Sequence, residues 1–156
     1  MKAVVYYSLQ GNCEFVANEI AGKLDAKTIR LVPDVEPPKK GFGMFFKGGG
    51  MAVMKKTPGL VGFDFNADDY DTIVLCSPVW AGRYAPAVRS FLSRTDLSGK
   101  KIAIVASSAG GDAEKMLDTL AADSRAEVIG RLSLVLPLKK QDEAREKIAQ
   151  FCKTLG

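Results

Sequence analysis

The sequence predicts a three-layer α/β fold of the doubly wound class, with a five-stranded parallel sheet covered by helices on both faces. The first observation is a set of five short apolar runs, which are typical of strands buried on both faces. The second is that helical spacing of apolar residues follows most of these runs. Such crossovers are right-handed and return the next strand in parallel, so we expect five βα units.

The first unit begins at the N-terminus. Residues 2–7 (KAVVYY) form an apolar run that predicts a buried strand, and the following turn leads into a helix with Asn12 as its N-cap. Its apolar positions recur at helical spacing at Phe15, Val16, Ile20, Ala21 and Leu24. Residues 27–32 predict the second strand.

An irregular basic insertion is expected at about residues 34–62. It is rich in proline and glycine, and residues 51–56 predict one further helical turn. Residues 37–60 contain five lysines and no acidic residue, whereas the whole chain has a net charge of +4, so the rest of the chain carries −1. The segment could cover a ligand, dock a partner, contact an anionic membrane surface peripherally, or simply pack its aromatic residues on the domain.

Three more units complete the pattern. Residues 72–76 (TIVLC), 101–106 (KIAIVA) and 127–137 predict the third, fourth and fifth strands. Helices are expected at residues 86–94, at residues 112–123, where Met116, Leu117 and Leu120 share one face, and at residues 141–155. Without a repeat or a linker, residues 1–156 form a single domain in this interpretation.

Composition excludes several classes of function. The 156 residues are 47% hydrophobic and 26% charged, which is typical of a globular domain, and no run is long enough for a transmembrane segment. The sequence has no histidine, which weakens hydrolytic and zinc-dependent mechanisms. Its three cysteines lack metal-site spacing and indicate free thiols, so we expect a cytoplasmic protein. The excess positive charge is confined to residues 37–60, which argues against a nucleic-acid-binding surface across the whole protein.

Ligands of an open α/β sheet bind beyond the carboxyl ends of its strands, which selects three loops, at residues 8–13, 77–83 and 107–111. The first loop, SLQGNC, offers a hydroxyl group, two side-chain amides and a glycine at a helix N-terminus, where free N–H groups favour a phosphate. It has no lysine or arginine. We therefore expect neutral donors to hold a phosphate that belongs to a larger ligand.

The other two loops suggest a flat aromatic ligand. The second, SPVWAGRY, places the chain's single tryptophan, Trp80, on a turn between a buried strand and its helix, where its face can stack on a planar ring. The third, SSAGG, combines two hydroxyl groups with two glycines, so its backbone can approach the edge of such a ring.

Together the three loops resemble those of the flavodoxin-like family, and the resemblance covers nearly the whole chain. The family's phosphate loop has a Thr/Ser-x-Thr-Gly-x-Thr pattern, and residues 78–82 are similar to its Pro-x-Trp/Tyr-x-Gly segment. The resemblance implies the strand order 2-1-3-4-5 and a non-covalently bound FMN as cofactor. The implied cofactor-binding residues are Ser8, Leu9, Gln10, Gly11, Asn12, Cys13, Pro78, Val79, Trp80, Ala81, Gly82, Ser107, Ser108, Ala109, Gly110 and Gly111.

Within this resemblance, Trp80 packs against the flavin ring, and the backbones of Ala81, Gly82 and Gly110 border its polar edge. Two threonines of the family's phosphate loop are replaced, by Gln10 and Cys13, and a thiol is a poor donor. Cys13 also lies at a helix N-terminus, which lowers the pKa of an exposed thiol. The third loop lacks the aromatic residue that many electron carriers have, and Arg83 stands near the expected ring, where a cation raises the potential.

Two functions remain open on these residues. One is an FMN-dependent oxidoreductase of the NAD(P)H or quinone type, with no catalytic side chain of its own. The other is an electron carrier that docks to a larger redox partner. Both involve a redox partner protein or a small-molecule electron donor or acceptor, and either a monomer or a homodimer.

Three other classes fit poorly. A phospho-acceptor domain of the same sheet order would need an aspartate after the third strand, where Cys76 and Ser77 stand. A dinucleotide-binding domain would need G-x-G-x-x-G after the first strand. A low-molecular-weight phosphatase would need an arginine six places after Cys13, where the chain has Glu19.

Overall fold

The computed structural model describes residues 1–36, 57–110 and 113–156. It contains six strands, β1 (Lys2–Tyr6), β2 (Lys27–Arg30), β3 (Thr72–Trp80), β4 (Arg83–Tyr84), β5 (Lys101–Ser108) and β6 (Glu127–Val135). Its helices are α1 (Asn12–Leu24), α3 (Pro86–Arg94), α4 (Ala113–Ser124) and α5 (Gln141–Thr154), with a 3₁₀ turn at Ala67–Asp69. The expected strands and helices in the described residues are thus confirmed, with small shifts of their ends.

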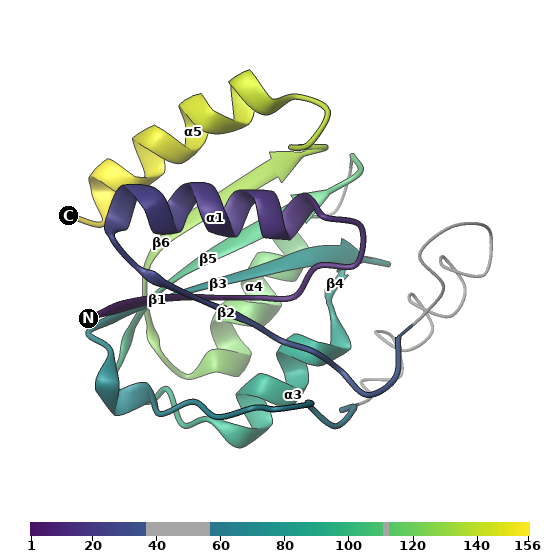
Figure 1. Cartoon of the computed structure of the whole chain (residues 1–156), viewed down its shortest axis with the longest axis vertical. Coiled ribbons are helices and arrows are strands. Elements are labelled where there is room, and N and C mark those ends of the chain that lie inside the picture. The colour runs from purple at the N-terminus through teal and green to yellow at the C-terminus, as the bar shows by residue number, and fades with distance from the viewer. Residues whose placement is uncertain (37–56, 111–112) are drawn as a thin grey trace.

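The five long strands form one parallel sheet in the order β2-β1-β3-β5-β6, with β4 paired only to β3 (Figure 1). Counting the parallel strands alone, this is the expected order 2-1-3-4-5. The order reverses between β1 and β3, whose register aligns Tyr6 with Cys76. The loops after β1 and β3 therefore diverge from this point and leave room for a ligand.

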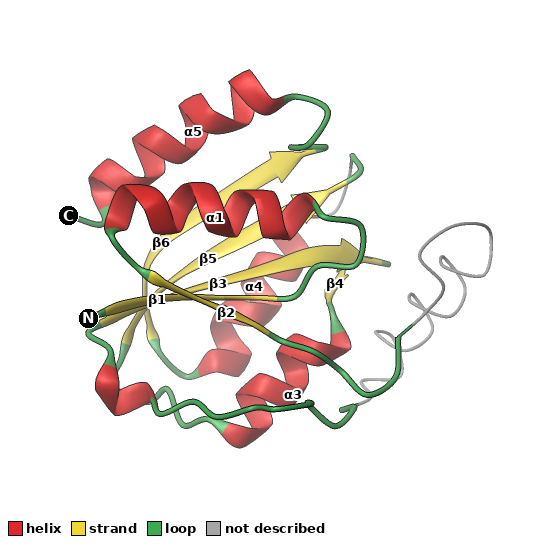
Figure 2. Ribbon diagram, viewed as in Figure 1, coloured by secondary structure: helices red, strands yellow, loops and turns green. Residues whose placement is uncertain are grey.

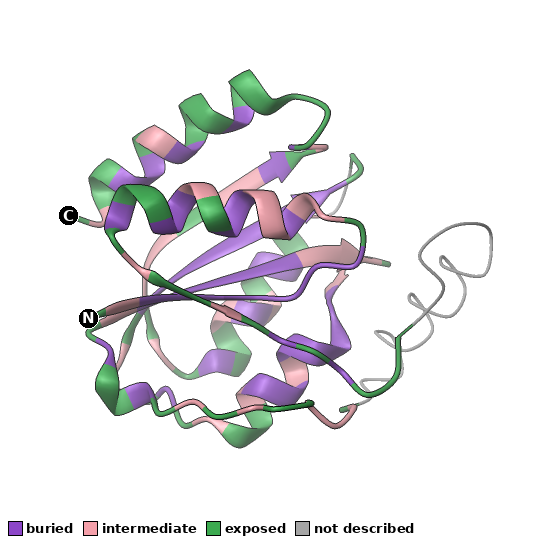
Figure 3. Cartoon of the chain, in the orientation of Figure 1, coloured by how far each residue is buried: buried purple, intermediate pink, exposed green. Residues whose placement is uncertain are grey.

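The apolar runs are explained by burial on both faces of the sheet, which Figure 3 shows along the central strands. Successive side chains of a strand point to opposite faces, so each run supplies two cores. In β3, Ile73 and Leu75 belong to one core, while Val74 and Cys76 belong to the other. This is why the central strands have no polar alternation.

Helices α1 and α5 cover one face of the sheet, and α3 and α4 cover the other (Figure 2). In α1 the buried positions include Val16, Ile20 and Leu24, which lie on one side of the helix. All described helices are too short or too polar to pass through a lipid bilayer.

The structure corrects the predicted start of two loops. Pro78, Val79 and Trp80 belong to β3 and not to a loop, because β3 extends to nine residues and pairs with β4. Likewise, Ser107 and Ser108 end β5 and remain paired with β6. The cause is hydrogen bonding to neighbouring strands, which a sequence pattern of apolar residues does not record.

The insertion predicted at residues 34–62 falls mostly outside the described residues, as does its helical turn at 51–56. Its two described ends lie side by side, because Pro33 and Leu60 form an antiparallel bridge and the Asp34 N–H group donates to the Gly59 carbonyl at 2.8 Å. The insertion therefore leaves and rejoins the domain at one place.

Candidate functional site

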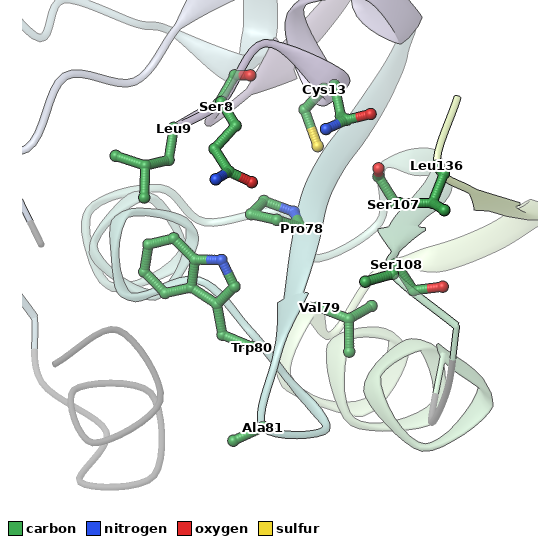
Figure 4. Close-up of a pocket in the computed structure, with 13 residues that line it drawn as sticks. Ser8, Leu9, Cys13, Pro78, Val79, Trp80, Ala81, Ser107, Ser108 and Leu136 are labelled. Carbon is green, nitrogen blue, oxygen red and sulfur yellow. The ribbon is translucent and has the colours of Figure 1, made fainter. Parts of the chain in front are cut away.

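A cleft of about 230 Å³ lies at the carboxyl ends of β1, β3 and β5 (Figure 4). In this view Leu9 and Trp80 stand on one side, and Ser107, Ser108 and Leu136 stand on the other. The lining residues come from all three expected loops and from the segment after β6. They are Ser8, Leu9, Gln10, Asn12, Cys13, Pro78, Val79, Trp80, Ala81, Ser107, Ser108, Ala109 and Leu136.

Most of the expected site residues thus come together in one cleft. Gly11, Gly82 and Gly110 are not among the residues that line it, although each lies next to one that does. Their φ angles of 98°, 74° and 144° explain the glycines, because this region is costly for other residues. Gly111 lies outside the described residues.

The first loop turns tightly beneath the N-terminus of α1. The Gly11 N–H group donates to the Ser8 hydroxyl oxygen at 3.1 Å, and Gly11 is the N-cap residue of α1. The N-cap residue is a glycine and so has no side chain to cap the helix, and the N–H groups of the first turn are suited to an anion. A Cβ atom at Gly11 would lie 3.3 Å from the Leu138 side chain, so Leu138 packs directly against this loop.

Asn12 is not the N-cap that we expected. It is the first residue of α1, and its side-chain oxygen accepts a hydrogen bond from the Leu138 N–H group at 3.2 Å. The reason is that Gly11 adopts the left-handed conformation, which moves the start of the helix by one residue. Asn12 therefore joins the first loop to the segment after β6.

Cys13 is not a reactive thiol of the kind that its place at the helix N-terminus suggested. It is only 1% exposed, and burial raises the pKa of its thiol well above the ordinary value. Desolvation of the thiolate is the largest cause of this rise in pKa. All three cysteines are buried and free.

Trp80 is held by a hairpin that the sequence analysis described only as a loop. Trp80 pairs with Arg83 across a two-residue turn, Ala81-Gly82, whose φ angles are 51° and 74°. Positive φ at both positions is typical of a type I′ turn. The indole ring also meets the Tyr7 ring edge to face, with 5.6 Å between centroids.

Ser77 fastens the base of this hairpin. Its side chain is fully buried, and its hydroxyl oxygen accepts a hydrogen bond from the Ala85 N–H group at 2.9 Å. The same hydroxyl donates to the Pro78 carbonyl at 2.9 Å. In the second strand of the hairpin, the Tyr84 hydroxyl donates to the Asp123 carboxylate of α4 at 2.6 Å. Trp80 therefore stands on a well-anchored support.

The segment after β6 is the part of the site that the sequence analysis missed. Leu136 lines the cleft with a φ of 47°, a conformation that costs a leucine about 1–2 kcal/mol. Its N–H group donates to the Ser108 carbonyl at 2.9 Å, which joins it to the third loop. The rule that selected the other loops, the carboxyl end of a strand, would have found this one as well.

None of the described residues that line the cleft carries a charge. That neutral donors hold an anion here remains a prediction. Arg83 does not line the cleft, but as the residue directly opposite Trp80 it projects from the same face of the hairpin.

Comparisons with solved structures agree with this fold. A flavoprotein from Lactobacillus acidophilus, solved in complex with FMN, has a TM-score of 0.75 at 19% identity, over 90% of this chain and 97% of the other. Oxidised flavodoxin 2 from Bacillus cereus has a TM-score of 0.61 at 22% identity, over 99% of this chain and 97% of the other. The two-electron reduced flavodoxin of Megasphaera elsdenii has a TM-score of 0.61 at 24% identity, over 98% of this chain and 99% of the other.

The sequence comparisons are more specific. No curated protein matches the chain. The sequence profile of the family described as flavodoxin, however, matches residues 1–135, which include the three expected loops and all six strands. The chain therefore belongs to the flavodoxin family.

Proposed function

We propose that the protein binds one FMN non-covalently in this cleft and transfers electrons through it. The observation that carries the proposal is that a helix N-terminus with a glycine N-cap, a tryptophan and three buried serines meet in one cleft, whose described lining carries no charge. A phosphate, a planar ring system and its polar edge would each meet a suitable surface there. The FMN-bound neighbour from Lactobacillus acidophilus supports the same ligand.

The residues fit this group part by part. Residues 8–13 would hold the phosphate, since Gly11 lets the backbone pass close and none of the described residues that line the cleft is acidic. Trp80 would stack against the ring, and Ser107 and Ser108 would border the opposite side. FMN, when bound, accepts and donates electrons, while the protein supplies position and electrostatics.

Between the two redox functions, we favour the small oxidoreductase. Among the described residues, Trp80 is the one aromatic residue that lines the cleft, and none lines it beside Ser107, Ser108 and Leu136. An organic substrate or a hydride donor needs such an open surface to lie against a ring. The electron carrier, docked to a larger redox partner, remains the second candidate, because it needs only an exposed ring edge.

The buried free thiols fit a reducing compartment, and we propose a cytoplasmic protein. The lysines between residues 37 and 60 remain a proposed contact for an anionic partner or membrane surface. Most of that segment lies outside the described residues.

An anaerobic reduction experiment tests the oxidoreductase against the carrier. Protein loaded with FMN is mixed with NADH, NADPH or a chemical reductant, and flavin absorbance is recorded with a quinone as the final acceptor. Multiple turnover with a nicotinamide supports the oxidoreductase. Reduction only by the chemical reductant, in two resolved one-electron stages, would contradict it and favour the carrier.

A further inference from the structure

Arg30 contacts the phosphate-binding loop from outside the cleft. It ends β2, the strand beside β1, so its side chain reaches the residues that follow β1. One guanidinium nitrogen donates to the Ser8 carbonyl at 3.1 Å, and the other forms an ion pair with the Glu14 carboxylate. The guanidinium carbon also lies 6.0 Å from the centroid of the Tyr6 ring.

The first of these contacts fixes the start of the loop. The Ser8 carbonyl accepts a hydrogen bond from Arg30, and the Ser8 hydroxyl oxygen accepts one from the Gly11 N–H group. The two hydrogen bonds therefore restrain the loop at its first residue, Ser8, and at Gly11. Such preorganisation lowers the entropy that a ligand loses when it orders the loop.

The second contact concerns charge. Glu14 lies in the first turn of α1, at the same helix end where the phosphate would bind. In the absence of a ligand, a carboxylate at this end stabilises the helix, but it repels a phosphate that binds at the same end. Arg30 neutralises Glu14, so the phosphate would meet an end of the helix without net side-chain charge.

We propose that Arg30 is a positioning residue for phosphate recognition, which orders the loop through Ser8 and cancels the charge of Glu14. The inference rests on the proposed FMN site. It predicts a selective effect: loss of Arg30 weakens the binding of the phosphate while leaving the stacking of the ring unchanged. A purely structural role for Arg30 would weaken both.

The experiment compares FMN with riboflavin, which has the same ring and ribityl chain but lacks the phosphate. Dissociation constants of both ligands are measured for the wild type, Arg30→Gln, Glu14→Gln and the double variant. Lys27→Gln is the matched control, since Lys27 is an exposed cation at the other end of β2. Arg30→Lys keeps the charge but lacks the two-pronged guanidinium group.

In Arg30→Gln we expect FMN to bind about tenfold more weakly, with riboflavin affinity unchanged within about twofold. Adding Glu14→Gln to this variant should recover about threefold in FMN affinity, because the unpaired carboxylate is gone. Lys27→Gln should change neither ligand by more than about twofold, since an exposed charge at that distance is screened. Higher salt should reduce the effect of Arg30→Gln, as expected for exposed charges.

Equal weakening of FMN and riboflavin in Arg30→Gln, or no weakening of either, would overturn the inference. The charge component would be overturned if Glu14→Gln restored no FMN affinity in the double variant. If Arg30→Gln does not fold, Arg30→Lys replaces it, with an expected loss of about threefold for FMN alone; equal losses for both ligands would overturn the inference. A folded wild type that binds neither ligand would overturn the proposed function itself, which is a different result.

Discussion

The Trp80 indole meets the Tyr7 ring edge to face, with an interplanar angle of 88°. Tyr7 directly precedes the first loop, and Trp80 ends β3, so this contact joins two of the loops that form the cleft. Tyr7 is only 1% exposed, so its ring is held by the core and the indole packs against it. The orientation of Trp80 is thus set by the protein before any ligand binds.

Replacement of Trp80 tests its role in stacking. We expect Trp80→Ala to weaken FMN binding by about tenfold or more, because the variant loses both the stacking and the buried area. Trp80→Tyr should stay within about threefold of the wild type, since it keeps an aromatic face. Both are measured by titration with FMN fluorescence, and an unchanged affinity in Trp80→Ala would contradict stacking.

Loss of the Ser77 hydroxyl should loosen the hairpin. Ser77→Ala leaves the buried Ala85 N–H group without its acceptor, which costs about 1–3 kcal/mol of unfolding free energy. Ser93→Ala is the control, because the Ser93 side chain is exposed and bonds only within its own helix, so the loss should stay below about 0.5 kcal/mol. Urea denaturation measures both, and equal losses would show that the Ser77 bond has no special role.

The turn beside Trp80 stores strain at Ala81. Since Ala81 has a φ of 51°, Ala81→Gly should raise the unfolding free energy by about 0.5–1 kcal/mol. The same change in the exposed helical residue Ala122 should lower it by about 0.5–1 kcal/mol. Thermal unfolding compares the two, and a destabilised Ala81→Gly would refute the strain.

The buried Cys13 thiol gives a pH dependence with a defined sign. Burial raises its pKa above the ordinary value of 9.0, so the folded state holds the proton more tightly than the unfolded chain. The stabilising contribution is complete below about pH 9 and is lost as the pH rises toward the folded pKa.

The wild type should therefore lose stability above pH 9 more steeply than Cys13→Ala, by up to about 1.4 kcal/mol per pH unit. Urea denaturation at several pH values between 7 and 10 measures the two slopes. Parallel curves for the two proteins would show that Cys13 does not titrate in this way.

Arg83 offers a test of electrostatic tuning. It projects from the same face of the hairpin as Trp80, so its charge lies near the expected ring and should stabilise an added electron. We expect Arg83→Gln to lower the midpoint potential by about 10–30 mV in a spectroelectrochemical titration. Arg94→Gln, at the far end of α3, should leave it unchanged. An equal potential in Arg83→Gln and the wild type would remove this role.

The parallel sheet could be predicted because burial on both faces leaves a clear pattern, whereas its strand order was implied only by the resemblance to the flavodoxin-like family. Runs such as residues 72–76 and 101–106 are almost entirely apolar, which is typical of parallel strands covered by helices on both faces. A second rule located the cleft: ligands of an open α/β sheet bind at the carboxyl ends of its strands. Trp80 was identifiable because a tryptophan at such a place is unusual.

Other features depend on contacts between distant residues, which the sequence pattern does not contain. The extension of β3 to Trp80 needs the partner strand β4, and the placement of Leu136 needs its bond to the Ser108 carbonyl. The pKa of the Cys13 thiol is raised by burial in the core that α1 and α5 form with the sheet, which a position at a helix N-terminus does not reveal. The Arg30 contacts join residues on separate elements in the same way.

The most direct measurement is a titration of the purified protein with FMN, monitored through the fluorescence of Trp80. Because Trp80 is the chain's single tryptophan, its emission reports only on the cleft. The account predicts that the emission is quenched and that the change saturates at one equivalent of FMN. A folded protein whose emission does not change, and which retains no FMN after gel filtration, would contradict the proposed site.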